Sequence, residues 1–243
     1  GNAHAVYGAH EVVDGEVLIL FGDTHFVGDL KGLKKIAGDG VIWVKPVEDP
    51  SPFGVVFKDG DFASKLIEKP DSPVSDLAMI GLYYFKDAKK LFSKIHHLLK
   101  HKVMTKGQFQ LTDAMQLLIN DGAKLVTREV KSWIDCGHDQ GLFQFQAHAL
   151  GKKQVVEGET HDVILIPPVF IGKGAVVKRS IIGPNVSIAG KAHVVDCVLK
   201  NSIIGSRSSV KRVGLSNSLV SEDAVVKAAL KSVRLDKGGF KAL

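Results

Sequence analysis

Aliphatic residues recur every six positions from about residue 164 onward. The spacing is clearest in two sets, Ile182, Ile188 and Val194, then Val198, Ile204 and Val210. Small residues such as Gly183 and Gly205 follow some of them, and aromatic residues are almost absent. A helix would need a spacing of 3.6, and a sandwich would need longer strands, whereas a period of six is typical of hexapeptide coils. We therefore predict a left-handed parallel β-helix over residues 163–243, in which the last 15 or so residues lose the period and form a cap.

The first 150 residues follow a different pattern, in which strand-like and helix-like segments alternate. We predict helical segments at 3–13, 30–37, 88–99, 111–119 and 141–150, and strands at 17–21, 41–47, 53–57, 62–67, 77–85 and 125–130. The run at 17–21 is continuously apolar, as in a strand that is buried on both faces. Alternation of this kind predicts a mixed, mostly parallel, Rossmann-like α/β sheet over residues 1–150. The polar residues 151–162 are expected to be a linker.

Composition excludes several classes of protein. No apolar run approaches the length of a membrane helix, and no signal-peptide pattern opens the sequence. Cys136 and Cys197 are too few for a disulfide framework, so we expect a cytoplasmic protein. The net charge of +6 is uneven, because residues 1–150 carry 17 basic and 19 acidic side chains. The basic excess therefore lies after residue 150, and without interleaved aromatic residues we do not expect a nucleic-acid partner.

Two aspartates follow apolar strand-like segments. Asp23 comes after the run that ends at Phe21, and Asp135 follows Trp133 and Ile134. Ligands of open α/β sheets bind at the carboxyl ends of strands. Two carboxylates that meet there would suit a divalent cation that bridges phosphates. Taken alone, a turn or a helix cap is the commoner role for such an aspartate.

Short motifs in a fixed order give a more specific signal. They are GNAHAV at 1–6, LFGD at 20–23, VEDP at 47–50, FGVV at 53–56, EKP at 68–70, IGLYYF at 80–85, GQFQLTDA at 107–114 and WIDCG at 133–137. In this order they resemble the sugar-1-phosphate nucleotidylyltransferases, and most closely the long-form glucose-1-phosphate thymidylyltransferases that carry a C-terminal left-handed β-helix. The resemblance covers residues 1 to about 150.

The resemblance implies a Mg²⁺-dependent reaction in which a hexose-1-phosphate, here glucose-1-phosphate, attacks the α-phosphorus of a nucleoside triphosphate, here dTTP, and pyrophosphate leaves. It implies that Asp23 and Asp135 hold the metal and that Lys69 contacts the sugar phosphate. It further implies substrate-binding roles for Gly1, Gly54, Glu68, Gly81, Tyr83, Lys106 and Trp133. From the residues alone, Glu68 and Lys69 could instead be an exposed strand-end pair, Gly54 and Gly81 could be bulge glycines, and Trp133 could belong to the core.

Departures from the family pattern lead to further expectations. The family opens with a strand and a glycine-rich loop containing Arg and Lys, and no segment of residues 1–243 matches it. We therefore expect little or no turnover from this polypeptide alone, and an apolar sheet edge that another chain could cover. Lys106 stands where some relatives have Arg, and Gln108 stands where Glu is usual, which leaves the sugar open.

The sequence leaves two other functions open. The chain could be a non-catalytic sugar-nucleotide-binding or regulatory subunit that has the same fold. It could also be an acyltransferase, since hexapeptide β-helices often carry acetyl transfer, but His193 is the only histidine inside the repeats. By analogy with other hexapeptide helices we expect a homo-oligomer, either a dimer or a trimer.

Overall fold

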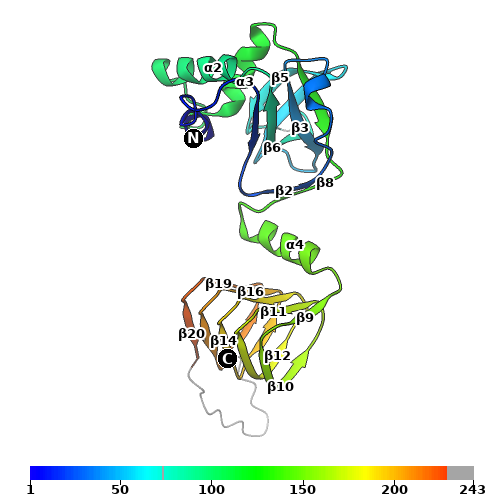
Figure 1. Ribbon diagram of the computed structural model, residues 1–243, viewed down its shortest axis with the longest axis vertical. Helices are drawn as coiled ribbons and strands as arrows, with labels where there is room; N and C mark the ends of the chain where they lie inside the picture. The colour runs from blue at the N-terminus through cyan, green and yellow to red at the C-terminus, as the bar shows by residue number, and fades with distance from the viewer. Residues whose placement is uncertain (73, 229–243) are drawn as a thin grey trace. The chain divides into compact units, whose positions relative to one another are not determined.

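The computed structural model describes residues 1–72 and 74–228, which fall into two compact units (Figure 1). The first unit comprises Gly1–Gly137, and the second begins at His138. In the described residues, no helix is both long and apolar enough to cross a membrane. The predicted cap at the end of the chain lies outside the described residues.

The first unit is built on a six-stranded sheet in the order β1-β6-β3-β7-β5-β4. Its strands are β1 (Val17–Leu20), β3 (Gly40–Pro46), β4 (Gly54–Asp59), β5 (Phe62–Glu68), β6 (Leu77–Phe85) and β7 (Leu125–Glu129). The sheet is mixed, as predicted, but the expectation that it is mostly parallel is wrong. Within the described residues of this six-stranded sheet, only β3 and β7 pair in parallel. The reason is that β6 runs antiparallel to β1, β3 and β4, while β4 and β5 form an antiparallel hairpin.

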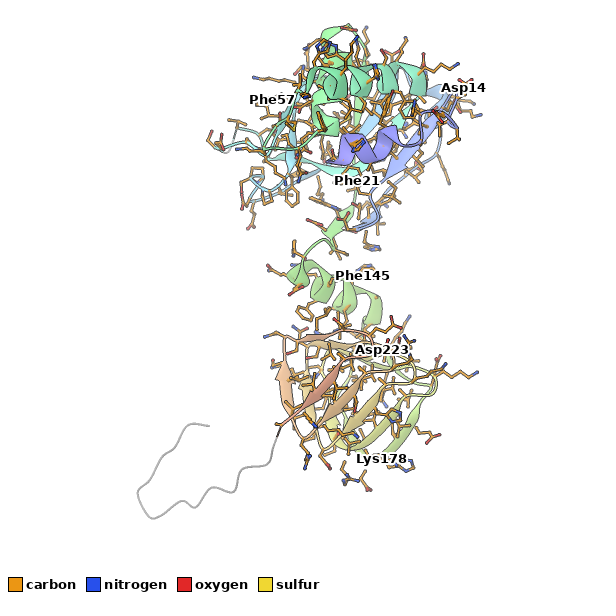
Figure 2. All side chains as sticks on the ribbon, turned by 90° about the vertical axis from the view of Figure 1, so that its left-hand side faces the viewer. Asp14, Phe21, Phe57, Phe145, Lys178 and Asp223 are labelled. Carbon is orange, nitrogen blue, oxygen red and sulfur yellow. The ribbon has the colours of Figure 1, made fainter. Side chains whose placement is uncertain are left out.

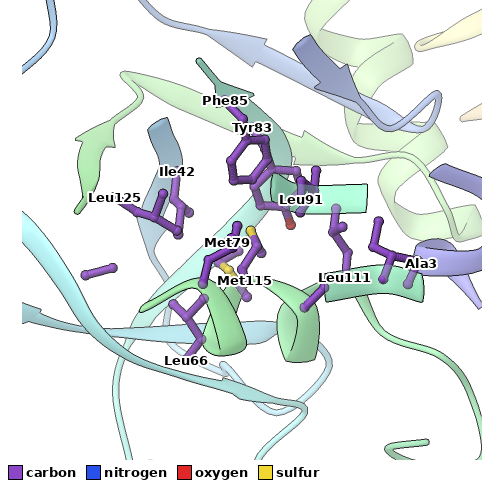
Figure 3. Packing of buried hydrophobic residues seen from close by; sticks show 14 of the residues in the cluster. Ala3, Ile42, Leu66, Met79, Tyr83, Phe85, Leu91, Leu111, Met115 and Leu125 are labelled. Carbon is purple, nitrogen blue, oxygen red and sulfur yellow. The ribbon is translucent and has the colours of Figure 1, made fainter. Parts of the chain in front are cut away.

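Helices cover one face of this sheet and a smaller apolar layer covers the other. The helices of the first unit are α1 (Asn2–Tyr7), α2 (Ala88–His101) and α3 (Leu111–Asn120), with a 3₁₀ turn at Leu33–Lys35. Leu91, Leu111 and Met115 pack with Met79 and Tyr83 of β6 (Figure 3). The opposite face of β3 and β6 buries Trp43, Ile80, Leu82 and Tyr84. Burial on both faces explains why β6 is apolar throughout its length.

Several local expectations for the first unit are corrected by the structure. The helix expected at 3–13 ends at Tyr7, and the one expected at 30–37 is the single 3₁₀ turn. The N-cap of α3 is Gln110. The expectation that the strand at 17–21 is buried on both faces is also wrong, since Leu18 and Leu20 of β1 are 48% and 52% exposed. The cause is the position of β1 at an edge of the described sheet, where only Val17 and Ile19 face the core.

The second unit is a parallel β-helix preceded by the helix α4 (Asp139–Leu150). Its strands are β9 (Gln154–Val156), β10 (Glu159–Leu165), β11 (Val169–Ile171), β12 (Val176–Ile182), β13 (Val186–Ile188), β14 (His193–Val195), β15 (Val198–Lys200), β16 (Ser202–Ile204), β17 (Ser209–Lys211), β18 (Gly214–Ser216), β19 (Leu219–Val220) and β20 (Val225–Lys227). Figure 2 shows the side chains on these coils, among them Lys178 and Asp223. The predicted β-helix is confirmed, and its left hand stays a prediction.

The β-helix begins before the position that the sequence suggested. The segment 151–162 was expected to be a linker, but it contains β9 and the first half of β10. β9 pairs with β11, and β10 pairs with β12, both in parallel. Their side chains are mostly exposed, because no earlier coil lies beneath them. A polar outer coil therefore has the composition of a linker although it is part of the stack.

The six-residue period places one aliphatic column on each inner side of the coils. Val177, Val194 and Val210 are partners in successive strands, and all three are fully buried. Each coil turns at residues in the left-handed backbone region, among them Arg179, Asn201 and Asp223. Asn and Asp adopt that region more readily than most residues do. Inward aliphatic columns and polar corners together define the solenoid.

Replacing Val194 with Ala tests how much one column contributes to stability. We expect a loss of about 2 kcal/mol in the free energy of unfolding, because the change leaves a cavity between Val177 and Val210. Urea unfolding followed by circular dichroism measures the loss. The matched control is Val225→Ala, because Val225 is 71% exposed and we expect almost no change there. Equal losses at both positions would contradict the expected column.

Candidate active site

Eight of the ten predicted site residues line one pocket of about 250 Å³ in the first unit. They are Asp23, Gly54, Glu68, Lys69, Gly81, Tyr83, Trp133 and Asp135. They come from β4, β5, β6 and β8 (Ser132–Asp135) and from the turn before β2 (Thr24–Val27). A larger hollow of about 550 Å³ beside α2 contains none of the predicted residues. Its Lys94 already forms an ion pair with Asp121.

The two aspartates converge because β2 and β8 form a small antiparallel ribbon. Thr24 is the partner of Asp135 in that ribbon, which places Asp23 beside the end of β8. The Cys136 amide donates to the Asp23 carbonyl at 2.8 Å, and the Gly137 amide donates to Asp135 Oδ1 at 2.9 Å. A methyl group on Gly137 would lie 3.0 Å from both Asp23 Oδ2 and Asp135 Oδ1. The two carboxylate oxygens therefore flank one point.

Negative charge accumulates at that point. Partial burial, together with the charges of Asp135 and Asp23, raises the pKa of the Cys136 thiol. Carboxylate oxygens are ligands that Mg²⁺ prefers, and Mg²⁺ sites usually combine one or two carboxylates with water and substrate phosphates. No group of three or more His, Cys, Asp or Glu side chains suited to a metal occurs in the described part of the chain. The donor set of Asp23 and Asp135 therefore fits a magnesium ion that phosphate oxygens help to hold.

Glu68 and Lys69 both line the pocket although they are neighbours in sequence. Successive side chains of a regular strand point to opposite faces. Here β5 ends at Glu68, and Lys69 has a φ of 44°, in the left-handed region. The Lys69 amide donates to the Phe53 carbonyl at 3.0 Å, which fixes the bend. The bend brings a carboxylate and an ammonium group to the same side.

Glu68 is held in a half-buried position next to Gly54. Thr112 Oγ1 donates to Glu68 Oε2 at 2.6 Å. Burial raises the pKa of Glu68, and the Thr112 hydrogen bond and the charge of Lys69 oppose that shift. A methyl group on Gly54 would lie 2.9 Å from Glu68 Oε2 and 2.4 Å from the end of Met79. Gly54 is therefore the residue that leaves room for the carboxylate.

Gly81 lies at a bulge in β6, where its φ is 78°. Its carbonyl accepts from the Phe21 amide at 2.9 Å, and a methyl group on it would approach the Phe21 ring to 2.7 Å. The bulge therefore lets the segment before Asp23 reach the sheet. Gly81 is thus a bulge glycine and also a lining residue.

Tyr83 lines the pocket from the same strand, β6. Burial, followed by the charge of Glu68, raises the pKa of Tyr83, so this phenol stays protonated.

Trp133 forms an aromatic wall of the pocket with Phe53. Their ring centroids are 4.8 Å apart, at an angle of 66°. Phe21, labelled in Figure 2, stacks edge-on against Tyr83 with centroids 5.8 Å apart. The pocket therefore combines aromatic walls with the polar groups of Glu68 and Lys69.

Two predicted residues lie outside the lining. Lys106 forms an ion pair with Asp71, and both side chains are largely exposed. A methyl group on Gly1 would lie 2.3 Å from the Phe109 carbonyl, so Gly1 allows the chain to pass close to the start of α3. Neither Gly1 nor Lys106 lines the pocket.

Sequence reasoning missed several lining residues, namely Asn2, Phe21, Thr24, Pro52, Phe53, Met79, Ile80, Gln110 and Thr112. Asn2 Oδ1 accepts from the Leu111 amide at 2.7 Å and so joins α1 to α3. Asn2, Phe53 and Thr112 stand inside the motifs at 1–6, 53–56 and 107–114. Their place in those motifs was the available signal, since their residue types alone do not mark a site.

Comparison with known proteins assigns the first unit to a family. Residues 1–152 match the family model described as nucleotidyl transferase. The chain therefore belongs to the nucleotidyl transferase family. It is 29% identical to the glucose-1-phosphate thymidylyltransferase of Streptomyces antibioticus over 259 residues, which is 95% of this chain and 71% of that protein. It is 30% identical to the bifunctional protein GlmU of Methanocaldococcus jannaschii over 281 residues, which is 97% of this chain and 66% of that protein.

A solved structure shares the fold. A Bacillus anthracis protein described as a glucose-1-phosphate thymidylyltransferase aligns with a TM-score of 0.52 and 23% identity, over 63% of each chain. The family and its sugar-1-phosphate nucleotidyltransferase relatives agree with the resemblance found in the motifs. The chain spans 66–71% of the length of the two curated relatives above.

Proposed function

We propose that the protein to which this chain belongs transfers a nucleotidyl group from a nucleoside triphosphate to a hexose-1-phosphate and releases pyrophosphate. We further propose dTTP and glucose-1-phosphate as the substrates and Mg²⁺ as the cofactor. The observation that carries the proposal is the meeting of Asp23, Asp135, Glu68 and Lys69 in one pocket. The name of one relative that matches nearly the whole chain, the glucose-1-phosphate thymidylyltransferase of Streptomyces antibioticus, supports the same substrates. Both cysteines are free, which fits the proposed cytoplasmic location.

The proposed roles follow from the charge and position of each side chain. Lys69 neutralises the phosphate of the sugar substrate, and Glu68 accepts hydrogen bonds from sugar hydroxyls. Trp133 and Tyr83 border the apolar side of the sugar, while Gly54 and Gly81 keep the floor of the pocket open. Asp23 and Asp135 would hold Mg²⁺, which supplies positive charge to the phosphates during the exchange. In such transfers positioning and electrostatic stabilisation provide most of the rate.

The raised pKa of Glu68 makes sugar binding sensitive to pH. Folding favours the neutral carboxyl, so the carboxylate that accepts sugar hydroxyls is lost at a higher pH than for an exposed Glu. We expect affinity for glucose-1-phosphate to fall as the pH is lowered from neutral into the acid range. Glu68→Gln should bind less tightly at neutral pH and lose this dependence on Glu68. Titration calorimetry over a pH series measures both, and an unchanged pH profile in the variant would contradict the role of Glu68.

Binding gives the direct test of the proposed function. Titration calorimetry of the 243-residue chain with glucose-1-phosphate and with the product dTDP-glucose, in the presence of Mg²⁺, should show binding that Asp23→Ala or Lys69→Ala abolishes. A pyrophosphate-release assay accompanies it. Residues 1–243 contain no match to the family's glycine-rich loop. We therefore propose that this polypeptide binds both ligands but shows little or no turnover. The absence of binding to either ligand would overturn the proposal.

A further inference from the structure

A stripe of exposed aliphatic side chains lies on one outer side of the β-helix. Ile164, Ile181 and Val198 are direct partners in successive parallel strands and are 61%, 36% and 54% exposed. The next position in this column is Gly214, the partner of Val198. Apolar side chains in the middle of a solenoid side are normally turned inward, so a continuous outward column calls for a covering surface. In the described residues α4 contacts a different side, where Gln146 donates to the carbonyl of Asn185.

A ladder of alternating charges runs beside this stripe. Its rungs are Asp162, Arg179, Asp196 and Arg212, each two residues before the corresponding member of the stripe. All four have positive φ, and each stands two residues before a position paired in the register of the stripe, so they occupy the same corner of successive coils. Arg179 Nε and Nη2 donate to the two carboxylate oxygens of Asp196 at 2.7 and 3.1 Å. The charges of Asp162 and Arg212 act on this pair from either end.

The order of these charges is complementary to its own reverse: read backward, the ladder has the opposite charge at every rung. If a second copy is turned so that its coils run in the opposite direction, the first rung faces the fourth and the second faces the third. Asp162 then faces Arg212 of the other copy, and Arg179 faces Asp196. Every facing pair has opposite charge. A uniformly charged surface such as nucleic acid or an anionic membrane would instead meet two rungs of like charge, so the pattern favours a second copy.

The shape of the stripe is self-complementary in the same register. Ile164, its most exposed member, would face Gly214 of the other copy, where the lack of a side chain interrupts the column. A hollow of about 300 Å³ lies there, lined by Asp196, Val198, Arg212, Val213 and Gly214. Ile181 and Val198 would face each other across the centre. One rotation therefore satisfies both the charges and the shape.

We propose that this side of the β-helix joins two copies of the chain in a two-fold symmetric dimer with antiparallel coils. The interface is isologous, because each copy contributes the same stripe and the same ladder. Ile164 of each copy fills the hollow at Gly214 of the other. The two ladders pair along the rim of the buried stripe. This dimer does not depend on the reaction proposed for the first unit.

A charge-swap cycle tests the predicted register. Sedimentation velocity over a concentration series should show that the 243-residue chain dimerises. Arg212→Glu places two carboxylates opposite Asp162 and should weaken the dimer by about tenfold or more. Adding Asp162→Arg restores opposite charges and should recover most of the affinity. The control is Lys191→Glu, because Lys191 has the same positive φ at another corner and should leave the dimer unchanged.

A size swap tests the fit of Ile164 into the hollow. Gly214→Leu adds apolar surface, yet it should weaken the dimer by filling the space that Ile164 of the other copy enters. A side chain at 214 is tolerated in the single copy, since its Cβ would meet only the Val198 carbonyl, at 3.9 Å. Ile164→Ala combined with Gly214→Leu should restore association. A monomer at all concentrations, a trimer, or tighter association of Gly214→Leu would overturn the proposal.

Discussion

Replacing Asp23 with Asn is expected to weaken divalent-metal binding by about 100-fold or more, because the remaining Asp135 supplies too little negative charge to hold the ion. The substitution keeps the size of the side chain, and the backbone bond from the Cys136 amide to the Asp23 carbonyl is unaffected. Asp135→Asn should have a similar effect. Titration with Mn²⁺ followed by electron paramagnetic resonance measures the metal directly, without need for turnover.

Asp29→Asn serves as the matched control for the metal site. Asp29 follows β2 and does not line the pocket. The substitution Asp29→Asn should leave the affinity for Mn²⁺ unchanged. If Asp23→Asn and Asp29→Asn bound Mn²⁺ equally well, the two converging carboxylates would not be the metal site. A double variant of Asp23 and Asp135 that lost no more than either single variant would support a shared ion.

Replacing Lys69 with Met is expected to weaken glucose-1-phosphate binding by about 30-fold or more, since a charge-assisted contact to phosphate is lost while the length of the side chain is nearly kept. Binding of unphosphorylated glucose should change little, because the proposed hydroxyl contacts belong to Glu68. Lys69→Arg should retain part of the phosphate affinity, since the charge remains but the geometry of the donors differs. Titration calorimetry with the two sugars separates these effects.

Lys65→Met is the control for this experiment. Lys65 lies on the same strand, β5, but its ammonium group sits 5.8 Å from the centre of the Phe57 ring, away from the lining residues. We expect no change in sugar-phosphate affinity. Equal losses at Lys65 and Lys69 would mean that the phosphate responds to the general charge of the hairpin, and the specific role of Lys69 would be wrong.

The β-helix could be predicted from sequence because its period is local. Each inward residue, such as Val194, repeats at a fixed distance along the chain, and few other folds require that spacing. The direction of the strands in the first unit could not be predicted in the same way. β6 pairs with β1, β3 and β4, which lie before it in the chain, and apolar composition does not tell parallel from antiparallel partners when both faces are buried.

The site was predicted only as far as its motifs reached. Asp23 and Asp135 are 112 positions apart in the sequence, and the β2–β8 ribbon that joins them has no strong pattern of its own. The bend at Lys69 was equally hidden, since a positive φ in a lysine has no sequence signature apart from the proline that follows. Lys106 was placed in the site by resemblance alone, and the structure pairs it with Asp71.

The coil repeat of the β-helix has a consequence for changes in chain length. Loss or gain of a whole coil, 16 or 17 residues, leaves every inward column in register, whereas a shorter insertion displaces all of them at once. The ladder of alternating charges adds a second condition, namely that the number of rungs must be even. Four alternating rungs read the same from both ends with the sign reversed, but three or five rungs would place like charges opposite each other. In the proposed dimer, adding or removing a pair of coils would therefore keep opposite charges facing each other. A single added coil would still fold, but it would place like charges opposite each other and weaken the dimer.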